Sequence, residues 1–173
     1  SRDTVYNCVE ALTNNPQVQE LLHPSGLIDA PISLNENALL LDVQAECPNG
    51  KTFIMHLKAK LDNFTIDLES DTVVVNDVKT IGKVVSEIDS NISKYHYSRE
   101  LAMYLFLLRL YVIKEYGIEN PTMKANYLVV STVPQYYTKV RAMTKKECYA
   151  GLHEFRTLLR YAAYQIGYNG YSL

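Results

Sequence analysis

The alternation of apolar and polar positions is clearest between residues 52 and 67, where it predicts one long, half-buried strand. A valine-rich run at 72–79 follows the polar turn Glu69-Ser70-Asp71, and a shorter apolar run at 39–45 precedes the turn Pro48-Asn49-Gly50. Turns this short join strands that run antiparallel to each other. The three runs therefore predict a three-stranded antiparallel meander.

Helical periodicity is found on both sides of this meander. Pro16 predicts the start of a second short helix within an N-terminal helical segment, and Gly117 predicts the end of a long apolar helix. Thr144 and Glu147 have the spacing of a capping box that opens the last helix. The predicted helices are residues 4–22, 81–88, 98–116 and 145–166, and two further strands are predicted at 127–132 and 136–142. This order predicts an α/β (α+β) fold with a mixed central sheet flanked by helices.

The composition fits a single globular domain covering residues 1–173, or a piece of a longer chain. Hydrophobic residues make up 47% of the chain and charged residues 21%, which excludes a disordered or fibrous protein. The chain contains neither a long apolar run nor a signal-peptide pattern, so we expect a cytoplasmic location and no membrane association. Cys8, Cys47 and Cys148 lack the paired spacing of a zinc site, which favours reduced thiols.

The formal net charge of −2 limits how this chain could bind nucleic acid. Proteins that bind nucleic acid often carry a positive balance, so any contact here would depend on local basic patches. Candidate patches are Lys58 with Lys60, and a second cluster of Lys139, Arg141, Lys145 and Lys146. The alternative interpretation of such clusters is a solvated protein surface.

Acidic and basic residues on the second and third predicted strands form the most informative pattern. If Glu69 and Ser70 make a two-residue turn, Asp62 lies opposite Asp77 and Lys60 lies opposite Lys79. Opposite residues of an antiparallel pair point to one face, with Cβ atoms about 5 Å apart. Asp77 and Lys79 also share a face because side chains alternate along a strand. The register therefore predicts that four ionisable groups converge.

Two carboxylates this close repel each other and favour a bound cation. Oxygen ligands suit Mg²⁺ or Mn²⁺, and the backbone carbonyl of Val78 is a further candidate ligand beside Asp62 and Asp77. Lys79 would then orient or deprotonate an attacking water, or stabilise a phosphate. This is the chemistry of phosphodiester hydrolysis. The alternative is a surface hairpin with cross-strand salt bridges.

The same residues resemble a known family. Lys58-x-Lys60-Leu61-Asp62, followed by Asp77-Val78-Lys79-Thr80, resembles the second and third motifs of RecB-like and RecE-like exonucleases in the PD-(D/E)xK nuclease superfamily. Residues 94–104 resemble the downstream helix of these enzymes, with Glu100 in place of the usual glutamine and Tyr104 four residues later. Residues 126–141 are also similar to phage-type members.

This resemblance implies a restriction-endonuclease-like core with a defined set of site residues. Asp62 and Asp77 would bind the metal, Lys79 would be catalytic, and Glu100 and Tyr104 would contact metal-bound water or DNA. The family's first motif, an acid or histidine on an N-terminal helix, has no clear counterpart. Its candidates are Glu20 and His23, with Glu10 as another, and the candidate nucleic-acid contacts are Lys58, Lys60, Tyr97, Lys139 and Arg141.

The leading functional hypothesis is a Mg²⁺-dependent or Mn²⁺-dependent DNA nuclease, and more specifically an exonuclease of recombination or DNA processing in a bacterial or phage-infected cell. DNA is the expected partner, with a homo-oligomer or a recombination protein as further candidates. A second hypothesis is a non-catalytic nucleic-acid-binding or assembly module on the same fold. An enzyme of another class is less supported, because the chain has neither a glycine-rich phosphate loop nor a Ser/His/Asp arrangement.

Overall fold

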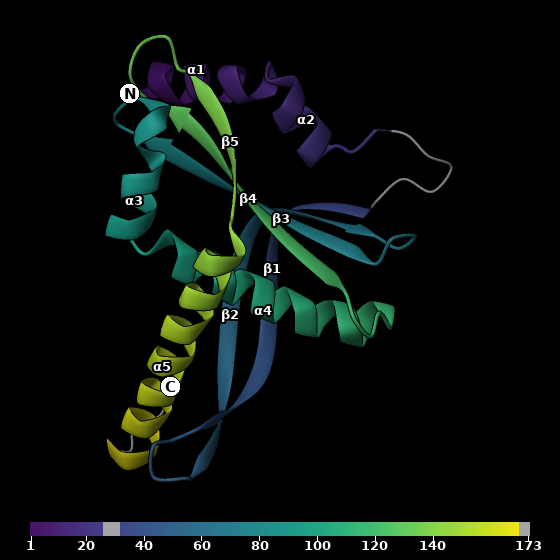
Figure 1. The fold of residues 1–173 in the computed structure, drawn as a ribbon, viewed down its shortest axis with the longest axis vertical. Helices are drawn as coiled ribbons and strands as arrows, with labels where there is room; N and C mark the ends of the chain where they lie inside the picture. The colour runs from purple at the N-terminus through teal and green to yellow at the C-terminus, as the bar shows by residue number, and fades with distance from the viewer. Residues whose placement is uncertain (26–31, 170–173) are drawn as a thin grey trace.

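Five strands form one mixed sheet in the computed structural model, which describes residues 1–25 and 32–169. The sheet order is β1-β2-β3-β4-β5, and only the β3–β4 pair is parallel. The elements are α1 (Arg2–Thr13), α2 (Pro16–Leu22), β1 (Ile32–Glu46), β2 (Thr52–Asp67), β3 (Thr72–Ile81), a 3₁₀ turn (Val85–Glu87), α3 (Ile88–Lys94), α4 (Tyr97–Tyr116), β4 (Thr122–Ser131), β5 (Thr138–Ala142) and α5 (Lys145–Asn169). Figure 1 shows their arrangement.

The expected mixed α+β architecture is confirmed, including the antiparallel meander of β1, β2 and β3. The short helix predicted at 81–88 is wrong in position. Ile81 is the last residue of β3 and is only 2% exposed, because its side chain packs in the core. Its carbonyl accepts a hydrogen bond from Thr132 N at 2.8 Å, which extends the β3–β4 ladder, and α3 begins only at Ile88.

Helices cover both faces of the sheet. The odd-numbered residues of β3 pack in the main core with α4, through contacts that include Leu101, Leu105 and Leu108. On the other face, Asn76 donates a hydrogen bond to the carbonyl of Leu21, which places α2 there. Alternation along β3 therefore sends residues 73, 75, 77 and 79 toward α4 and residues 74 and 76 toward α2.

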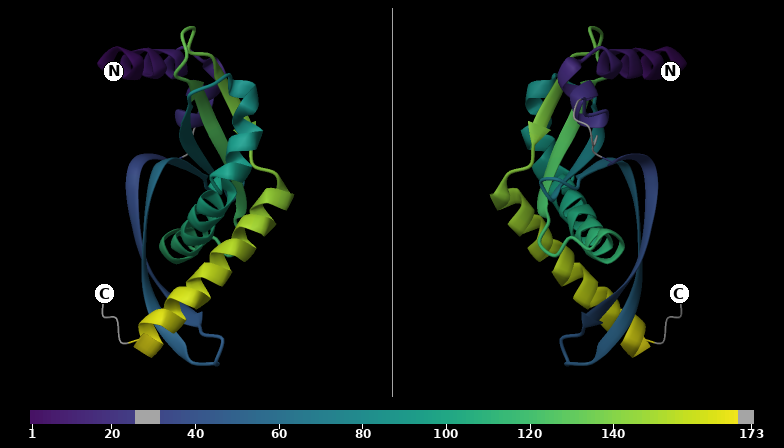
Figure 2. Two further views of the ribbon diagram at one scale, coloured as in Figure 1. Left: turned by 90° about the vertical axis from the view of Figure 1, so that its left-hand side faces the viewer. Right: turned by 90° about the vertical axis from the view of Figure 1, so that its right-hand side faces the viewer.

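The long β1–β2 hairpin leaves the sheet part-way along its length. β2 pairs with β3 only from Asp67–Thr72 to Asn63–Asn76, whereas β1 and β2 stay paired as far as Glu46–Thr52. We call residues 37–61 of this hairpin the arm. Figure 2 shows the arm curving away from the sheet, with α5 running toward its tip. Arg160 on α5 donates to the carbonyl of Glu46 at 3.2 Å, so the helix and the arm support each other.

The predicted capping box of the last helix is confirmed. Thr144 N donates to Glu147 Oε2 at 2.8 Å, and Glu147 N donates to Thr144 Oγ1 at 3.2 Å. These reciprocal bonds satisfy backbone donors that a helix N-terminus leaves free. Gly117 follows α4 with φ +68°, a left-handed conformation that glycine adopts without steric strain.

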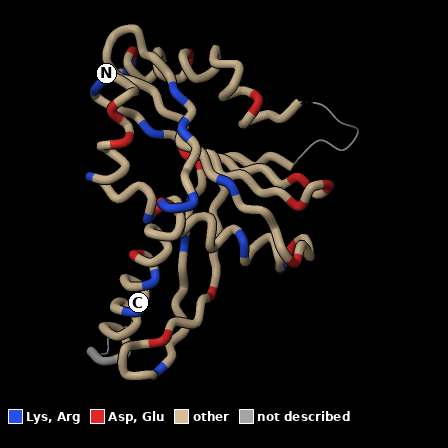
Figure 3. The backbone as a smooth tube through the Cα atoms, viewed as in Figure 1, with Lys and Arg blue, Asp and Glu red and all other residues tan. Residues whose placement is uncertain are grey.

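The three cysteine thiols are free, and Cys8 and Cys47 are buried. Among the described residues, no helix has both the length and the apolar character that crossing a membrane requires. Figure 3 shows acidic residues gathered where β2 turns into β3, away from the central part of the sheet. The formal net charge of −2 is therefore the sum of acidic and basic regions of the surface.

Candidate active site

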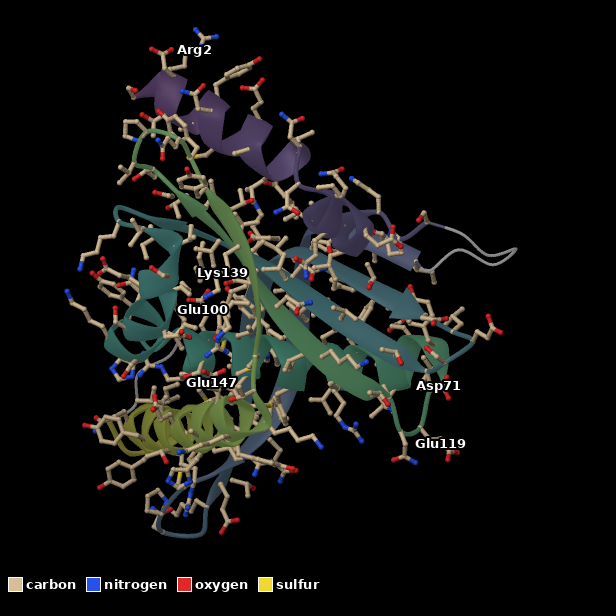
Figure 4. The ribbon with its side chains drawn as sticks, turned by 45° about the horizontal axis from the view of Figure 1, so that its top comes forward. Arg2, Asp71, Glu100, Glu119, Lys139 and Glu147 are labelled. Carbon is tan, nitrogen blue, oxygen red and sulfur yellow. The ribbon has the colours of Figure 1, made fainter. Side chains whose placement is uncertain are left out.

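A chain of polar contacts runs from the centre of β3 to the start of α4. Lys79 Nζ lies 2.8 Å from Asp77 Oδ2 and 3.0 Å from Glu100 Oε1. The hydroxyl of Tyr104 donates to the same oxygen of Glu100 at 3.3 Å. The structure thus brings together four residues that the sequence singles out, and Figure 4 shows Glu100 on the side of the sheet that carries α3.

Local geometry explains why these four side chains meet. Asp77 and Lys79 are two residues apart on β3, so both point toward α4. Glu100 and Tyr104 are four residues apart on α4, so they lie one above the other. Glu100 also occupies the first turn of α4, where the helix dipole favours a negative charge.

Asp62 joins this group from β2, at the point where the arm begins. Its Oδ2 accepts a hydrogen bond of 2.7 Å from the backbone N–H of Val78. The opposite residue on β1, Glu36, has φ +46°, a conformation rare for a residue with a side chain. The hairpin bends here, and the Asp62 carboxylate takes the place of the backbone partner that Val78 lacks.

The backbone carbonyl of Val78 points to the same gap between β2 and β3. The carbonyl of Asp71 accepts a hydrogen bond from Thr122, and the carbonyl of Ile81 accepts one from Thr132. Both donors lie at the ends of β4. The odd-numbered residues of β3 therefore direct their backbone groups toward β4. Val78 is even-numbered and directs both its N–H and its carbonyl toward β2. This gap therefore contains a carboxylate and a backbone oxygen next to buried Asp77.

The predicted hairpin register is confirmed from Asn63–Asn76 to Asp67–Thr72, but its extension to Lys60 and Lys79 is wrong. Lys60 pairs with Ala38 of β1 and lies 3.5 Å from Glu36 Oε2 on the exposed surface of the arm. The reason is the bend, since β2 has separated from β3 before Lys60 is reached. Lys58 is likewise exposed on the arm, away from Lys79.

Burial controls the electrostatics of the acid on β3. The side chain of Asp77 is 6% exposed, and desolvation raises its pKa to about 6. The attraction of Lys79 acts in the opposite direction, while the negative charges of Glu100 and Asp62 raise the pKa further. An additional positive charge close to Asp77 would therefore stabilise the ionised form of its carboxylate.

Lys79 remains an ammonium group in this environment. Desolvation alone would lower its pKa, but the charges and hydrogen bonds of Asp77 and Glu100 outweigh this effect and raise the pKa above its ordinary value. Burial and the nearby charge of Glu100 raise the pKa of Tyr104 to about 12, so its hydroxyl stays a neutral hydrogen-bond donor. Both groups can therefore donate to an anion near neutral pH.

The oxygens that could hold a metal here are two carboxylates and one backbone carbonyl, from Asp62, Asp77 and Val78. Residues 1–25 and 32–169 contain no group of three or more His, Cys, Asp or Glu side chains arranged to hold a metal ion. In this structure the amine of Lys79 lies between Asp77 and Glu100, and its single positive charge compensates only part of their negative charge. Oxygen donors of this kind suit Mg²⁺ or Mn²⁺ more than zinc.

The candidates for the family's first motif lie elsewhere. α2 covers the face of the sheet opposite α4, and there Glu20 hydrogen-bonds Ser25 at 2.7 Å. His23 is exposed at the end of the same helix, and Glu10 is exposed on α1. The sheet separates Glu20 and His23 from Asp77.

The predicted nucleic-acid contacts fall into different environments. Tyr97 lies beside the site, with Lys79 Nζ 4.7 Å from its ring centre. Lys139 is half-buried and in register with Val129, and therefore with Lys79, on the same face of the sheet. Arg141 lies 2.8 Å from Asp89 and hydrogen-bonds Glu147. Arg141 therefore joins α3 and α5 to β5 instead of presenting a free charge.

One site neighbour was missed by sequence reasoning. Tyr127 lies between Asp77 and Arg141 in the register of three adjacent strands, and its side chain is fully buried. Its hydroxyl has no hydrogen-bond partner among the described residues. The apolar run at 127–130 predicts a buried strand, but no local pattern distinguishes a tyrosine next to the acids from one in the core.

Comparison with known proteins supports the fold. No model of a known protein family matches this chain, and neither does any curated protein. The structure is similar to the crystal structure of a protein from Eubacterium rectale named "Putative exonuclease", with a TM-score of 0.59 and 9% sequence identity. The match covers 98% of this chain and 55% of that one, so this chain spans about half the length of its structural neighbour. The chain therefore shares the fold of this neighbour over about half of the neighbour's length.

Proposed function

We propose that this chain is a metal-dependent DNA nuclease of the PD-(D/E)xK superfamily that hydrolyses phosphodiester bonds. The observation that carries the proposal is the meeting of Asp62, the Val78 backbone, Asp77 and Lys79 where β2 leaves β3. The likeness in fold to the protein named "Putative exonuclease" supports the same activity. Exonuclease action in recombination or DNA processing is the form we favour, with Mg²⁺ or Mn²⁺ as the cofactor.

The ion would be held by the carboxylates of Asp62 and Asp77 and by the Val78 carbonyl. The fit rests on the burial of Asp77, whose pKa is raised by desolvation and by neighbouring carboxylates, so a cation would relieve an unfavourable charge. When bound, the ion would neutralise phosphate charge and lower the pKa of a coordinated water.

The other residues of the site have separate roles in this proposal. The Lys79 ammonium donates to a non-bridging phosphate oxygen and stabilises charge that develops on it. Glu100 positions Lys79 through the 3.0 Å contact and accepts a hydrogen bond from a water. Tyr104 orients Glu100 by donating to its carboxylate. Lys139, on the same face, attracts the DNA backbone.

Cleavage of a linear DNA substrate with and without a chelator tests the proposal. We expect Asp77→Asn, Asp62→Asn and Lys79→Ala each to lower the rate at least 100-fold, as losing a principal catalytic group does. Asp42→Asn is the matched control, because Asp42 is an exposed carboxylate on the arm, bonded to His56. Cleavage by Lys79→Ala in chelator at the wild-type rate would end the proposal.

A second candidate is a non-catalytic nucleic-acid-binding module. The absence of a three-residue metal group among the described residues favours it, as does the placement of Glu20 and His23 on the other face of the sheet. This candidate predicts DNA binding that weakens steeply with salt but no cleavage products. Nucleotide release that requires Mg²⁺ would exclude it.

A further inference from the structure

Two tyrosines are stacked at the junction between α3 and α4. The rings of Tyr95 and Tyr97 have centres 5.7 Å apart and an angle of 27° between their planes. His96, between them, has φ +54° and ψ 37°, a left-handed conformation that is unfavourable for a residue with a side chain. This conformation ends α3, starts α4 and directs the two rings to the same side. Non-glycine residues held in this way are enriched at functional sites.

The stacked rings lie between two amines. Lys79 Nζ is 4.7 Å from the ring centre of Tyr97, and Lys94 Nζ is 5.1 Å from the ring centre of Tyr95. The four side chains thus form a series in the order Lys79, Tyr97, Tyr95 and Lys94. The series starts at the candidate catalytic lysine and continues toward the surface. Tyr97 is half-buried, whereas Tyr95 is 51% exposed.

The junction is also braced from a second helix. His96 Nδ1 lies 3.2 Å from Glu154 Oε2 on α5, and Arg99 lies 3.9 Å from the same carboxylate. This support keeps the rings in place without covering Tyr95. The half-exposed ring of Tyr95 is therefore available for a further contact at this surface.

Aromatic rings beside amines are the combination that binds unpaired nucleotides. Bases stack on exposed rings, while lysine and arginine neutralise the phosphates between them. A base in a duplex has both faces covered by its neighbours, so only an unpaired or terminal base can stack on Tyr95. The Lys79 amine at the inner end of the series places this stack next to the proposed phosphate site.

We propose that Tyr95 and Tyr97 form a stacking subsite for an unpaired nucleobase close to the phosphate that is cut. The inference rests on the proposed nuclease function for the position of that phosphate. It adds a preference for single-stranded DNA, or for a frayed end, over a fully paired duplex. Lys94 moves from the Tyr95 ring to a backbone phosphate when the base binds.

A fluorescent base analogue tests the subsite directly. The probe is a short single-stranded oligodeoxynucleotide with 2-aminopurine at its end, titrated with protein in Ca²⁺ at one salt concentration. Stacking quenches the probe, and we expect Tyr95→Ala to weaken binding about 10-fold, in the range measured for losing one base–aromatic stack. Tyr95→Phe should bind as wild type does, because the ring and not the hydroxyl makes the stack.

Two controls separate stacking from general effects. Tyr161→Ala removes a tyrosine of α5 that is 61% exposed and should leave affinity unchanged. In competition against the fluorescent probe, an unlabelled oligodeoxynucleotide with an abasic terminal nucleotide should bind wild type about 10-fold more weakly than the same oligodeoxynucleotide with its terminal base. The two competitors should bind Tyr95→Ala equally, as expected for a coupled pair. Thermal unfolding of each variant checks that its fold is retained.

The results distinguish this inference from the nuclease proposal. Equal affinity of wild type and Tyr95→Ala, or no binding of the probe by wild type, overturns the stacking subsite even if Mg²⁺-dependent cleavage is observed. Quenching that depends on the Tyr95 ring supports the subsite even if wild type releases no cleavage product in Mg²⁺. The two proposals can therefore fail separately.

Discussion

Asn76 Nδ2 donates a 2.8 Å hydrogen bond to Asn63 Oδ1 across the last paired residues of β2 and β3. The next residue on each strand toward the site is an acid, Asp77 on β3 and Asp62 on β2. Asn35 and Asn126 continue the bond series to β1 and β4, and all four asparagines lie in one row of the sheet. This row fixes the register at the point where β2 and β3 separate.

Replacing Asn76 by alanine should therefore destabilise the protein by about 3 kcal/mol, because it leaves the buried polar groups of Asn63, Asn126 and Leu21 without their partner. Urea unfolding measures the change, and the exposed Asn120→Ala is a control expected within about 0.5 kcal/mol of wild type. If Asn76→Ala lowered the free energy of unfolding as little as the control does, the row of asparagines would have no role in stability.

The stability of the metal-free protein should depend on pH through Asp77. The unfolded chain releases this proton near the ordinary pKa of 3.8, whereas the folded protein keeps it until about pH 6. Between these values the folded state binds more protons, so the free energy of unfolding falls as the pH rises through this window. Asp77→Asn cannot titrate, so the stability of the variant relative to wild type should increase by roughly 2–3 kcal/mol from pH 4 to pH 6.5.

Unfolding of both proteins in chelator at a series of pH values measures this difference. Added Mg²⁺ should then stabilise wild type more than Asp77→Asn at pH 7, because an ion that binds only the folded state raises its stability. A stability difference that stays constant over the window would show that Asp77 has an ordinary pKa.

Tyr127→Phe should stabilise the protein by about 1 kcal/mol. The Tyr127 hydroxyl is buried with no hydrogen-bond partner among the described residues, and an unsatisfied buried polar group carries a desolvation penalty. Phenylalanine keeps the packing of the ring and removes the hydroxyl. A thermal melt provides the measurement, and destabilisation by this substitution would show instead that the hydroxyl has a bound partner such as a water.

Arg141→Met should destabilise the fold by about 1–2 kcal/mol, because Glu147 and Asp89 lose a partner that is 18% exposed. Lys146→Met is the control, because Lys146 is an exposed residue next to Glu147 in the first turn of α5. Denaturant unfolding of both variants gives the comparison. Weaker DNA binding by Arg141→Met without any loss of stability would instead assign Arg141 to a nucleic-acid interface.

Most elements and the inner part of the site follow from local pattern. The exceptions are the helix predicted at 81–88 and the first strand, predicted at 39–45 but extending from Ile32 to Glu46. Alternation gave the bounds of β2 correctly, and the capping box marked the start of α5. The spacings of Asp77 with Lys79 and of Glu100 with Tyr104 each place two side chains on one face, whatever the rest of the chain does. Their catalytic roles stay predictions.

Tertiary structure alone decided where the other candidates lie. The bend at Glu36 and Asp62 moves Lys60 away from Lys79, and no local pattern shows where a long strand leaves its neighbour. Glu20 lies on the face of the sheet opposite the site, because α2 packs on that face. Arg141 has two acidic partners, because α3 and α5 both approach β5. Local sequence determined the elements and their faces, because strand and helix periodicity depend on near neighbours. Which residues form the site depended on contacts between segments that are far apart in the chain, and only the packed fold brings these segments together.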